Sequence, residues 1–289
     1  KEYEDFIDAQ LQITLQSSSK DIPLLSFAIA LSYPFHKIFY ANGGMGKLFD
    51  DMLKDIDVKN SEEIKYIKKE RDFYRLISTK NEYLSSKVVL NAPVFECSEI
   101  FLDEDIKNYY KKFEFYDQSA FVIYLKIDSQ KEFLNHYQII LKDTIPNTIT
   151  KSFFVSFSHK DDEKLSKNGY SVTISSHTKA LFWDNLSKDE YETKKEFTKN
   201  FIIDELLKNI SDIKKEDIKI EFCATSKTFK RYINRFNCGA TPLNLKNIFK
   251  IPSSTTPFKN LYNIGDSVFA GQGWPGVALG VKVLSQNLI

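Results

Sequence analysis

The 289-residue chain is poor in the residues that usually mark a metal or covalent site. It has only three cysteines, Cys97, Cys223 and Cys238. They lack the spacing of metal ligands and form no even disulfide set, which favours a reducing compartment. The four histidines are scattered, and we interpret them as surface or structural residues: His36, His136, His159 and His177. We therefore expect no metal site.

Charge and hydrophobicity exclude further classes. The net charge is +1, so no broad electrostatic field favours nucleic acid. The sequence has no P-loop lysine motif and no nucleophile elbow. The longest apolar stretch, residues 22–35, is too short to span a bilayer. We favour its burial in the core, with peripheral membrane contact of a cytoplasmic protein as the alternative.

The first third of the sequence predicts helices and one strand. Residues 1–19 show helical spacing, with Phe6, Ala9 and Ile13 on one face. Glycines at 43, 44 and 46 predict a loop that precedes another helix. We expect residues 58–91 to begin as a helix. The apolar run 88–90 predicts a strand buried on both faces, as in a parallel sheet.

The middle of the sequence changes to short runs of β-branched and aromatic residues. They predict a mostly antiparallel sheet with one covered face, from strands at 121–127, 137–141, 153–157, 170–175 and 218–223. A helix is expected at 189–210, with its buried face formed by Phe197, Phe201, Leu206 and Ile210. A second helix, 226–236, is expected to be capped by Thr225 or Ser226.

Two charged clusters have alternative interpretations. The acids at 160–164 could ligate a metal, but we favour a solvated turn. Arg231 and Arg235 lie four residues apart on one predicted helix face, so they could contact a phosphate or pair with acids. We favour the ion pair.

The segment "LYNIGDSVFAGQGWPGVALGVKVLSQ", residues 261–286, holds half of the ten glycines. It predicts a strand, a turn and a helix that begins near Pro275. The free N–H groups at a helix start favour anions, and glycines let a ligand approach the backbone. Asp266 could accept hydrogen bonds from ligand hydroxyls. Tight packing of the helix on a sheet explains the glycines equally well, and Trp274 within the segment could be a core residue or a ligand contact.

Part of this segment, "IGDSVFAGQGWPGVALG", resembles the C-terminal flavin-binding motif of the phytoene desaturase, carotenoid isomerase and retinol saturase family of the amine oxidase superfamily. Three other segments resemble that family in the right order: "YANGGMGKLFDDMLKDI", "SKVVLNAP" and "ATSKTFKRYINRFNCGA". The resemblance therefore extends over most of the chain.

The resemblance implies an α/β fold in which an FAD-binding Rossmann-like domain is interrupted by a substrate domain with a mixed, mostly antiparallel sheet. The expected segments are 1–98, 99–222 and 223–289, with the middle one forming the substrate domain. The family's cofactor-binding positions correspond here to Gly265, Asp266, Ser267, Gly271, Gln272, Gly273, Pro275, Gly276 and Val277. Gly43 and Gly44 would lie close to the isoalloxazine and the substrate passage. No catalytic side chain is implied, because the flavin carries the redox step.

The sequence departs from the family in lacking the opening strand, G-x-G-x-x-G turn and helix that hold the ADP half of FAD, since its one match to that spacing, residues 271–276, lies in the C-terminal motif. Its first residues resemble a point inside a complete relative. We therefore expect the C-terminal part of an FAD-dependent oxidoreductase acting on C–C bonds of a polyene or isoprenoid. A separate chain would then supply the missing FAD half. A flavin-free remnant or interaction module, and an amine-oxidase-type flavoenzyme, stay open as alternatives.

Overall fold

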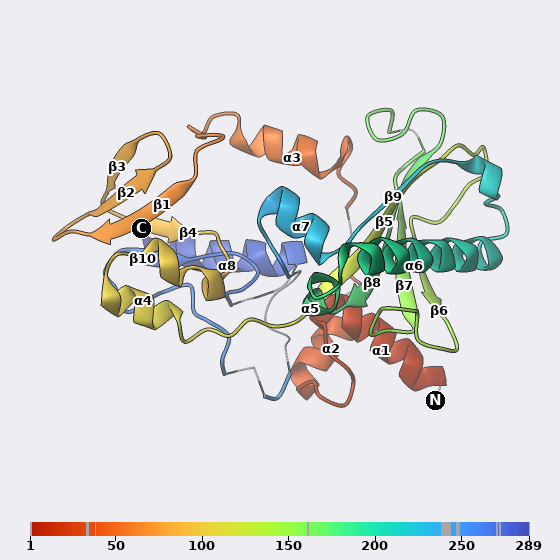
Figure 1. Ribbon diagram of the computed structural model, residues 1–289, viewed down its shortest axis with the longest axis horizontal. Coiled ribbons are helices and arrows are strands. Elements are labelled where there is room, and N and C mark those ends of the chain that lie inside the picture. The colour runs from red at the N-terminus through yellow and green to blue at the C-terminus, as the bar shows by residue number, and fades with distance from the viewer. Residues whose placement is uncertain are drawn as a thin grey trace. The chain divides into compact units, whose positions relative to one another are not determined.

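The computed structural model describes residues 2–32, 35–37, 39–160, 162–237, 244–246, 249–269, 271 and 273–288 (Figure 1). The chain forms two compact units. Unit 1 comprises residues 1–20, 24–56 and 117–238, and unit 2 comprises residues 21–23, 57–116 and 239–289. These boundaries are not those of the expected segments 1–98, 99–222 and 223–289, because residues 24–56 group with the middle of the chain. The assignment of functions to domains stays a prediction.

Unit 1 is built on a five-stranded antiparallel sheet with the order β6-β7-β8-β5-β9. Its strands are β5 (Ser119–Ile127), β6 (His136–Ile140), β7 (Ser152–Phe157), β8 (Tyr170–Thr178) and β9 (Ile218–Ala224). The central pair, β5 and β8, stays in register from Ser119 opposite Thr178 to Ile127 opposite Tyr170. The mixed α/β architecture with an antiparallel sheet confirms the expected fold class.

One face of this sheet is covered by α6 (Lys188–Asn209), which runs across the strands in Figure 1. Alternate residues of β5 are buried beneath it, as a half-covered strand requires. The short helix α5 (Ala180–Asp184) places Trp183 in the same core with no exposed surface. The Trp183 indole N–H donates to Thr178 Oγ1 at 3.0 Å, so its single polar group is satisfied.

The expected buried face of α6 is confirmed for three of its four residues, since Leu206 and Ile210 are buried and Phe201 packs against the core, but not for Phe197. Thr198, Ile202 and Leu206 are fully buried, whereas Phe197 is 57% exposed. Phe197 precedes Thr198 by one residue, which rotates its side chain by about 100° around the helix. Ser187 and Glu190 form a capping box that fixes where the helix begins.

The remaining helices of unit 1 are α1 (Glu2–Leu15), α2 (Leu24–Ser32), α3 (Gly44–Leu53) and α7 (Ser226–Ile233), and the short turn η4 (Lys215–Asp217) leads from α6 into β9. Thr225 is the N-cap of α7, as expected. Helix α1 also forms as expected, and Ala9 is buried together with Ile7 and Leu11, but Phe6 and Ile13 of the expected face are 50% and 37% exposed.

The favoured burial of residues 22–35 is wrong for most of that stretch. Ile22 and Ala30 are buried, but Leu24, Leu25 and Phe35 are 73–89% exposed. A helix that is apolar all round can bury only the stripe that meets a neighbour, and the main neighbour of α2 is the single helix α1. Among the residues that the structure describes, no helix has the length and apolar character needed to cross a membrane.

Unit 2 contains an antiparallel meander of β1 (Ile64–Lys69), β2 (Tyr74–Ser78) and β3 (Glu82–Ser85). The expected helix at the start of 58–91 is therefore wrong. Two tight turns fold the segment back on itself, with backbone bonds from Glu70 to Phe73 and from Ser78 to Asn81. The alternation buries Ile67 and leaves charged neighbours in solvent, which is a strand period rather than a helix period.

A second, parallel pair joins β4 (Val88–Leu90) to β10 (Leu261–Asn263). Parallel pairing of residues 88–90 confirms that prediction, although Val89 is 40% exposed and only one face of the strand is buried. The unit is completed by η2 (Val94–Glu96), η3 (Ser98–Ile100), α4 (Glu104–Tyr110) and α8 (Gly273–Leu288). Its core packs around fully buried aromatic rings, including Phe101 and Tyr110, which stack at 5.2 Å.

We predict that Ile202→Ala lowers the free energy of unfolding by about 2–5 kcal/mol, because it leaves a cavity in the core under α6. Phe197→Ala on the same helix removes a larger but exposed side chain and should change it by no more than about 0.5 kcal/mol. Denaturant unfolding followed by circular dichroism measures both. Equal losses for the two variants would contradict the helix orientation.

Candidate functional site

The turn after β10 in unit 2 is shaped by the parallel strand pair. Parallel strands end at the same edge of a sheet, which places Asn91, after β4, beside Gly265, after β10. The ladder continues one step further, since Ile264 N–H donates to Leu90 O at 2.8 Å. Gly265 has φ +108°, and a Cβ there would lie 2.8 Å from Asn91 Oδ1. The positive φ therefore favours glycine at 265, and any other residue would also have to displace the Asn91 side chain.

The next residues fasten the turn to unit 2. Val268 N–H closes the turn on Gly265 O at 3.3 Å. Ser267 is 3% exposed, and its hydroxyl oxygen accepts the Val94 N–H at 3.2 Å. The Ser267 side chain thus anchors the turn to η2. Asp266 lies between these two anchored positions and is partly exposed.

The later glycines have a different environment. Gly271 has φ +99°, and a Cβ added to it would meet no atom within 4 Å. Helix α8 begins two residues later at Gly273, which has φ +67°. Gly273 and Trp274 are exposed, and the first turn of α8 contains no acid. Gly271 itself is buried, and the exposed start of α8, with no acid in its first turn, leaves room and partial positive charge for a polar or anionic group.

The other expected positions lie in or near the same helix start. Pro275 is exposed in the first turn, where its missing N–H costs no hydrogen bond. Gly276 and Val277 follow it and are partly exposed. Gln272 lies outside the described residues. Gly265 and seven other residues expected from the motif thus lie in one turn and at the start of one helix.

Sequence reasoning missed Asn263 at the end of β10. It has no exposed surface, and its Oδ1 accepts a 2.6 Å hydrogen bond from the Tyr110 hydroxyl. Its side-chain N–H₂ has no partner among the described residues. The sequence feature that could have indicated Asn263 is its position as a polar residue at the end of an otherwise apolar strand.

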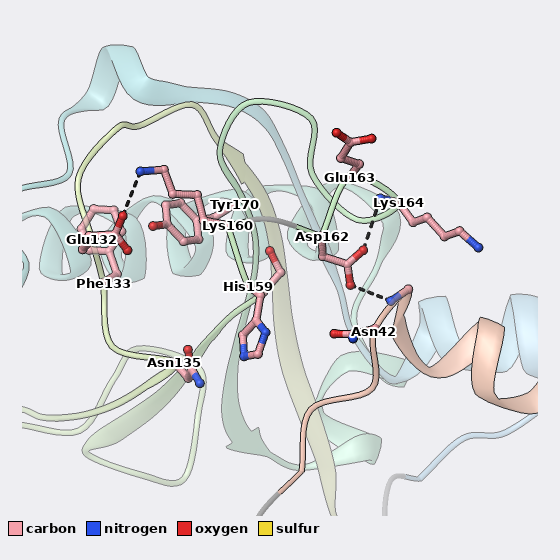
Figure 2. A pocket seen from close by; sticks show the side chains of 12 residues that line it. Asn42, Glu132, Phe133, Asn135, His159, Lys160, Asp162, Glu163, Lys164 and Tyr170 are labelled. Atoms are coloured by element: carbon pink, nitrogen blue, oxygen red, sulfur yellow. Dashed lines mark hydrogen bonds and ion pairs between the residues drawn. The ribbon is translucent and has the colours of Figure 1, made fainter.

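Gly43 and Gly44 belong to unit 1, so the structure does not join them to the turn in unit 2. Both have left-handed backbones, with φ +83° and +79°, and Gly43 is the N-cap of α3. The Gly43 N–H donates to Asp162 Oδ2 at 2.6 Å, and the Tyr40 hydroxyl donates to the same oxygen at 2.9 Å. Figure 2 shows this carboxylate between the glycine segment and the backbone N–H of Lys164.

Asp162 is the second residue that sequence reasoning missed. It lies in the 160–164 segment, which forms a turn as expected, but Asp162 itself is 9% exposed rather than solvated. The hydrogen bond from Gly43 is the main cause that holds its pKa below the usual 3.8, and the Tyr40 bond adds to it. In the described residues no group of three His, Cys, Asp or Glu side chains could hold a metal.

A cavity of about 730 Å³ adjoins this carboxylate (Figure 2). The His159 ring stacks on Tyr40 at 3.8 Å with an angle of 15° between the planes. The Lys160 ammonium pairs with Glu132 at 2.9 Å across the opening. Several polar side chains in the cavity wall therefore pair with one another. We interpret these side chains as a support that holds the glycine segment in place.

No family model matches the chain. The chloroplastic prolycopene isomerase of Daucus carota is 25% identical over 294 residues, which is 94% of this chain and 48% of that protein. The chloroplastic prolycopene isomerase 2 of an Oncidium hybrid cultivar is 27% identical over 300 residues, or 94% of this chain and 50% of that protein. These homologues bear out the resemblance to carotenoid isomerases. The chain spans about half the length of the curated relatives it matches.

Solved structures share the fold at low sequence identity. An oxidoreductase from Methanosarcina mazei has a TM-score of 0.65 at 17% identity, covering 98% of this chain and 64% of that one. A cyclohexylamine oxidase from Brevibacterium oxydans has a TM-score of 0.57 at 11% identity, covering 94% and 60%. The architecture is thus similar to that of FAD-dependent oxidoreductases and amine oxidases.

We predict that Asp162→Ala speeds hydrogen exchange at the Gly43 amide severalfold, whereas Asp162→Asn, which keeps a carbonyl oxygen, changes it less. Hydrogen bonds to the carboxylate lower its pKa, so they stabilise the fold above pH 3.8 and are lost as the pH falls below it. The wild-type Gly43 amide should lose protection in that acid range. NMR exchange measures this, with β8 amides as the control. Unchanged Gly43 exchange in Asp162→Ala would contradict the role of the carboxylate.

Proposed function

We propose that this chain forms the C-terminal portion of an FAD-dependent oxidoreductase that acts on C–C bonds of a polyene or isoprenoid. The observation that carries the proposal is the exposed start of α8 at Gly273 and Trp274, preceded by Gly271, which is buried but has empty space at its Cβ position. The similarity to prolycopene isomerases over 94% of the chain supports the same conclusion.

The residues of the turn fit a flavin's polar tail. The backbone of Gly271, Gly273 and the first turn of α8 would hold pyrophosphate or ribityl oxygens, because their N–H groups have no helical partner. Asp266 would accept hydrogen bonds from ribityl hydroxyls rather than face a phosphate, which it would repel. Gly265 and Ser267 would shape the turn without contacting the cofactor through side chains.

When bound, FAD supplies the hydride chemistry, so the chain's own residues need only orient the substrate and exclude water. The curated relatives are named as isomerases, which favours a double-bond isomerisation over net desaturation or saturation. The one G-x-G-x-x-G spacing of the sequence, residues 271–276, belongs to the C-terminal motif, so we propose that a dinucleotide-binding turn outside the sequence, on the same or a separate chain, holds the ADP half of FAD.

We predict that Gly271→Ala weakens FAD binding about tenfold, because the added methyl group and the positive φ displace backbone N–H groups from the cofactor. Gly46→Ala is the matched control, since a Cβ there also meets nothing but its φ is not positive. The affinity is measured by flavin fluorescence, with the segment that carries the dinucleotide-binding turn present. Equal FAD affinities for the two variants would place the cofactor elsewhere.

The reaction class is tested on the reconstituted holoprotein with a cis-polyene and with a primary amine. Isomerised, desaturated or saturated polyene supports the proposal and distinguishes its three forms. Oxidation of the amine alone would assign the chain to the amine oxidases. Absence of flavin binding under all conditions would favour a flavin-free interaction module.

We also propose peripheral membrane contact through the exposed apolar residues of 22–35. Replacing Leu24, Leu25 and Ile29 by Gln should lower the bound fraction in liposome sedimentation at least threefold, since each exposed leucine or isoleucine contributes about 1 kcal/mol or more when buried in lipid. Circular dichroism confirms that the variant stays folded. Unchanged partitioning would contradict membrane contact through these residues.

A further inference from the structure

A groove of about 610 Å³ lies within unit 1, between β9, α7 and the first turns of α6. Its apolar walls include Tyr124 and Phe222, which face each other across β5 and β9 and stack at 4.9 Å. Phe222, Tyr232 and Ile233 are 55%, 73% and 63% exposed. A hollow of this size with aromatic walls is typical of a small-molecule site, and exposed apolar patches in soluble proteins usually bind something.

Positive charge gathers along the same groove. The Lys195 and Lys227 ammonium groups lie 5.3 and 5.0 Å from the centroid of the Tyr191 ring. The Arg231 guanidinium lies 5.5 Å from the centroid of the Tyr232 ring. Among the described residues, Arg231 thus contacts an aromatic ring and does not form the ion pair with an acid that we expected.

These three cations are poorly neutralised. The groove lining contains one carboxylate, Glu192. Within the described part of the chain, no carboxylate lies in ion-pair distance of Lys195, Lys227 or Arg231. Lys227 instead donates to the Leu186 carbonyl at 2.9 Å. Both ammonium groups lie near the Tyr191 ring, and a carboxylate bound beside them would pair with positive charge that no described acid neutralises.

We propose that this groove binds a free long-chain fatty acid, with its alkyl or polyene chain on the aromatic wall and its carboxylate at Lys195, Lys227 and Arg231. A neutral hydrocarbon would use the apolar wall but leave the cations unpaired. A phosphopeptide or other polar anion would use the cations but leave Phe222 and Ile233 in water. The proposal does not rest on flavin binding, because the flavin-facing turn belongs to unit 2.

The probe is cis-parinaric acid, a fluorescent polyene fatty acid, titrated into the full chain without FAD. Its methyl ester, which has the same chain without the charge, is titrated in parallel. The acid should bind about tenfold more tightly than the ester, since its carboxylate meets exposed cations. The double variant K195Q/R231Q should remove this preference and leave the ester's affinity unchanged. K208Q is the control, because Lys208 lies on α6 but pairs with Glu205 and is not in the groove lining.

A second variant separates the apolar wall from the charge. Phe222→Ser should weaken the acid and the ester together, by about tenfold. Equal affinity for acid and ester in the wild type, or a preference that survives K195Q/R231Q, would overturn the proposal. So would binding of anionic phospholipid vesicles in place of monomeric acid, which would assign the groove to a membrane surface. Melting temperatures of all variants confirm that they are folded.

Discussion

Unit 2 depends on the parallel pairing of β4 with β10, two strands that lie far apart in the sequence. Three residue pairs, from Val88–Leu261 to Leu90–Asn263, hold them, and flanking backbone bonds extend the ladder at both ends. Closing so long a loop costs conformational entropy, though the cost grows only slowly with length. Most of the loop between the two strands, residues 117–238, lies in unit 1 and is ordered by the core of that unit's own sheet. The pairing of β4 with β10 therefore does not have to offset the entropy of the whole loop.

The same pairing creates the turn that we assign to the cofactor. Because both strands end at one edge, Asn91 lies beside residue 265, where the positive φ favours glycine. The turn is then held by side chains rather than by further strand pairing: Ser267 accepts the Val94 N–H, and Asn263 accepts the Tyr110 hydroxyl. A preorganised turn of this kind can present backbone N–H groups without the entropic cost of ordering a loop when a ligand binds.

Local patterns predicted the elements better than their faces or their distant contacts. Residue composition and the positions of turn-forming residues predicted the antiparallel strands, the parallel strand at 88–90 and the helix near Pro275. The buried face of α6 followed only in part: Leu206 and Ile210 are buried as predicted, but Phe197 and Thr198 are adjacent and hydrophobicity alone favoured the wrong one. The bond from Gly43 to Asp162 could not be predicted at all, since it joins a loop to a turn more than a hundred residues later.

The glycine-rich motif also shows why a sequence cannot separate packing from binding. Gly265 and Gly271 both have positive φ, and both match the family's motif. A side chain at 265 would strike Asn91, whereas one at 271 would enter open space. Packing against Asn91 therefore accounts for the first glycine with or without a ligand, whereas no packed neighbour accounts for the second, which is itself buried. Flavin binding at the start of α8 is our proposal for that second glycine.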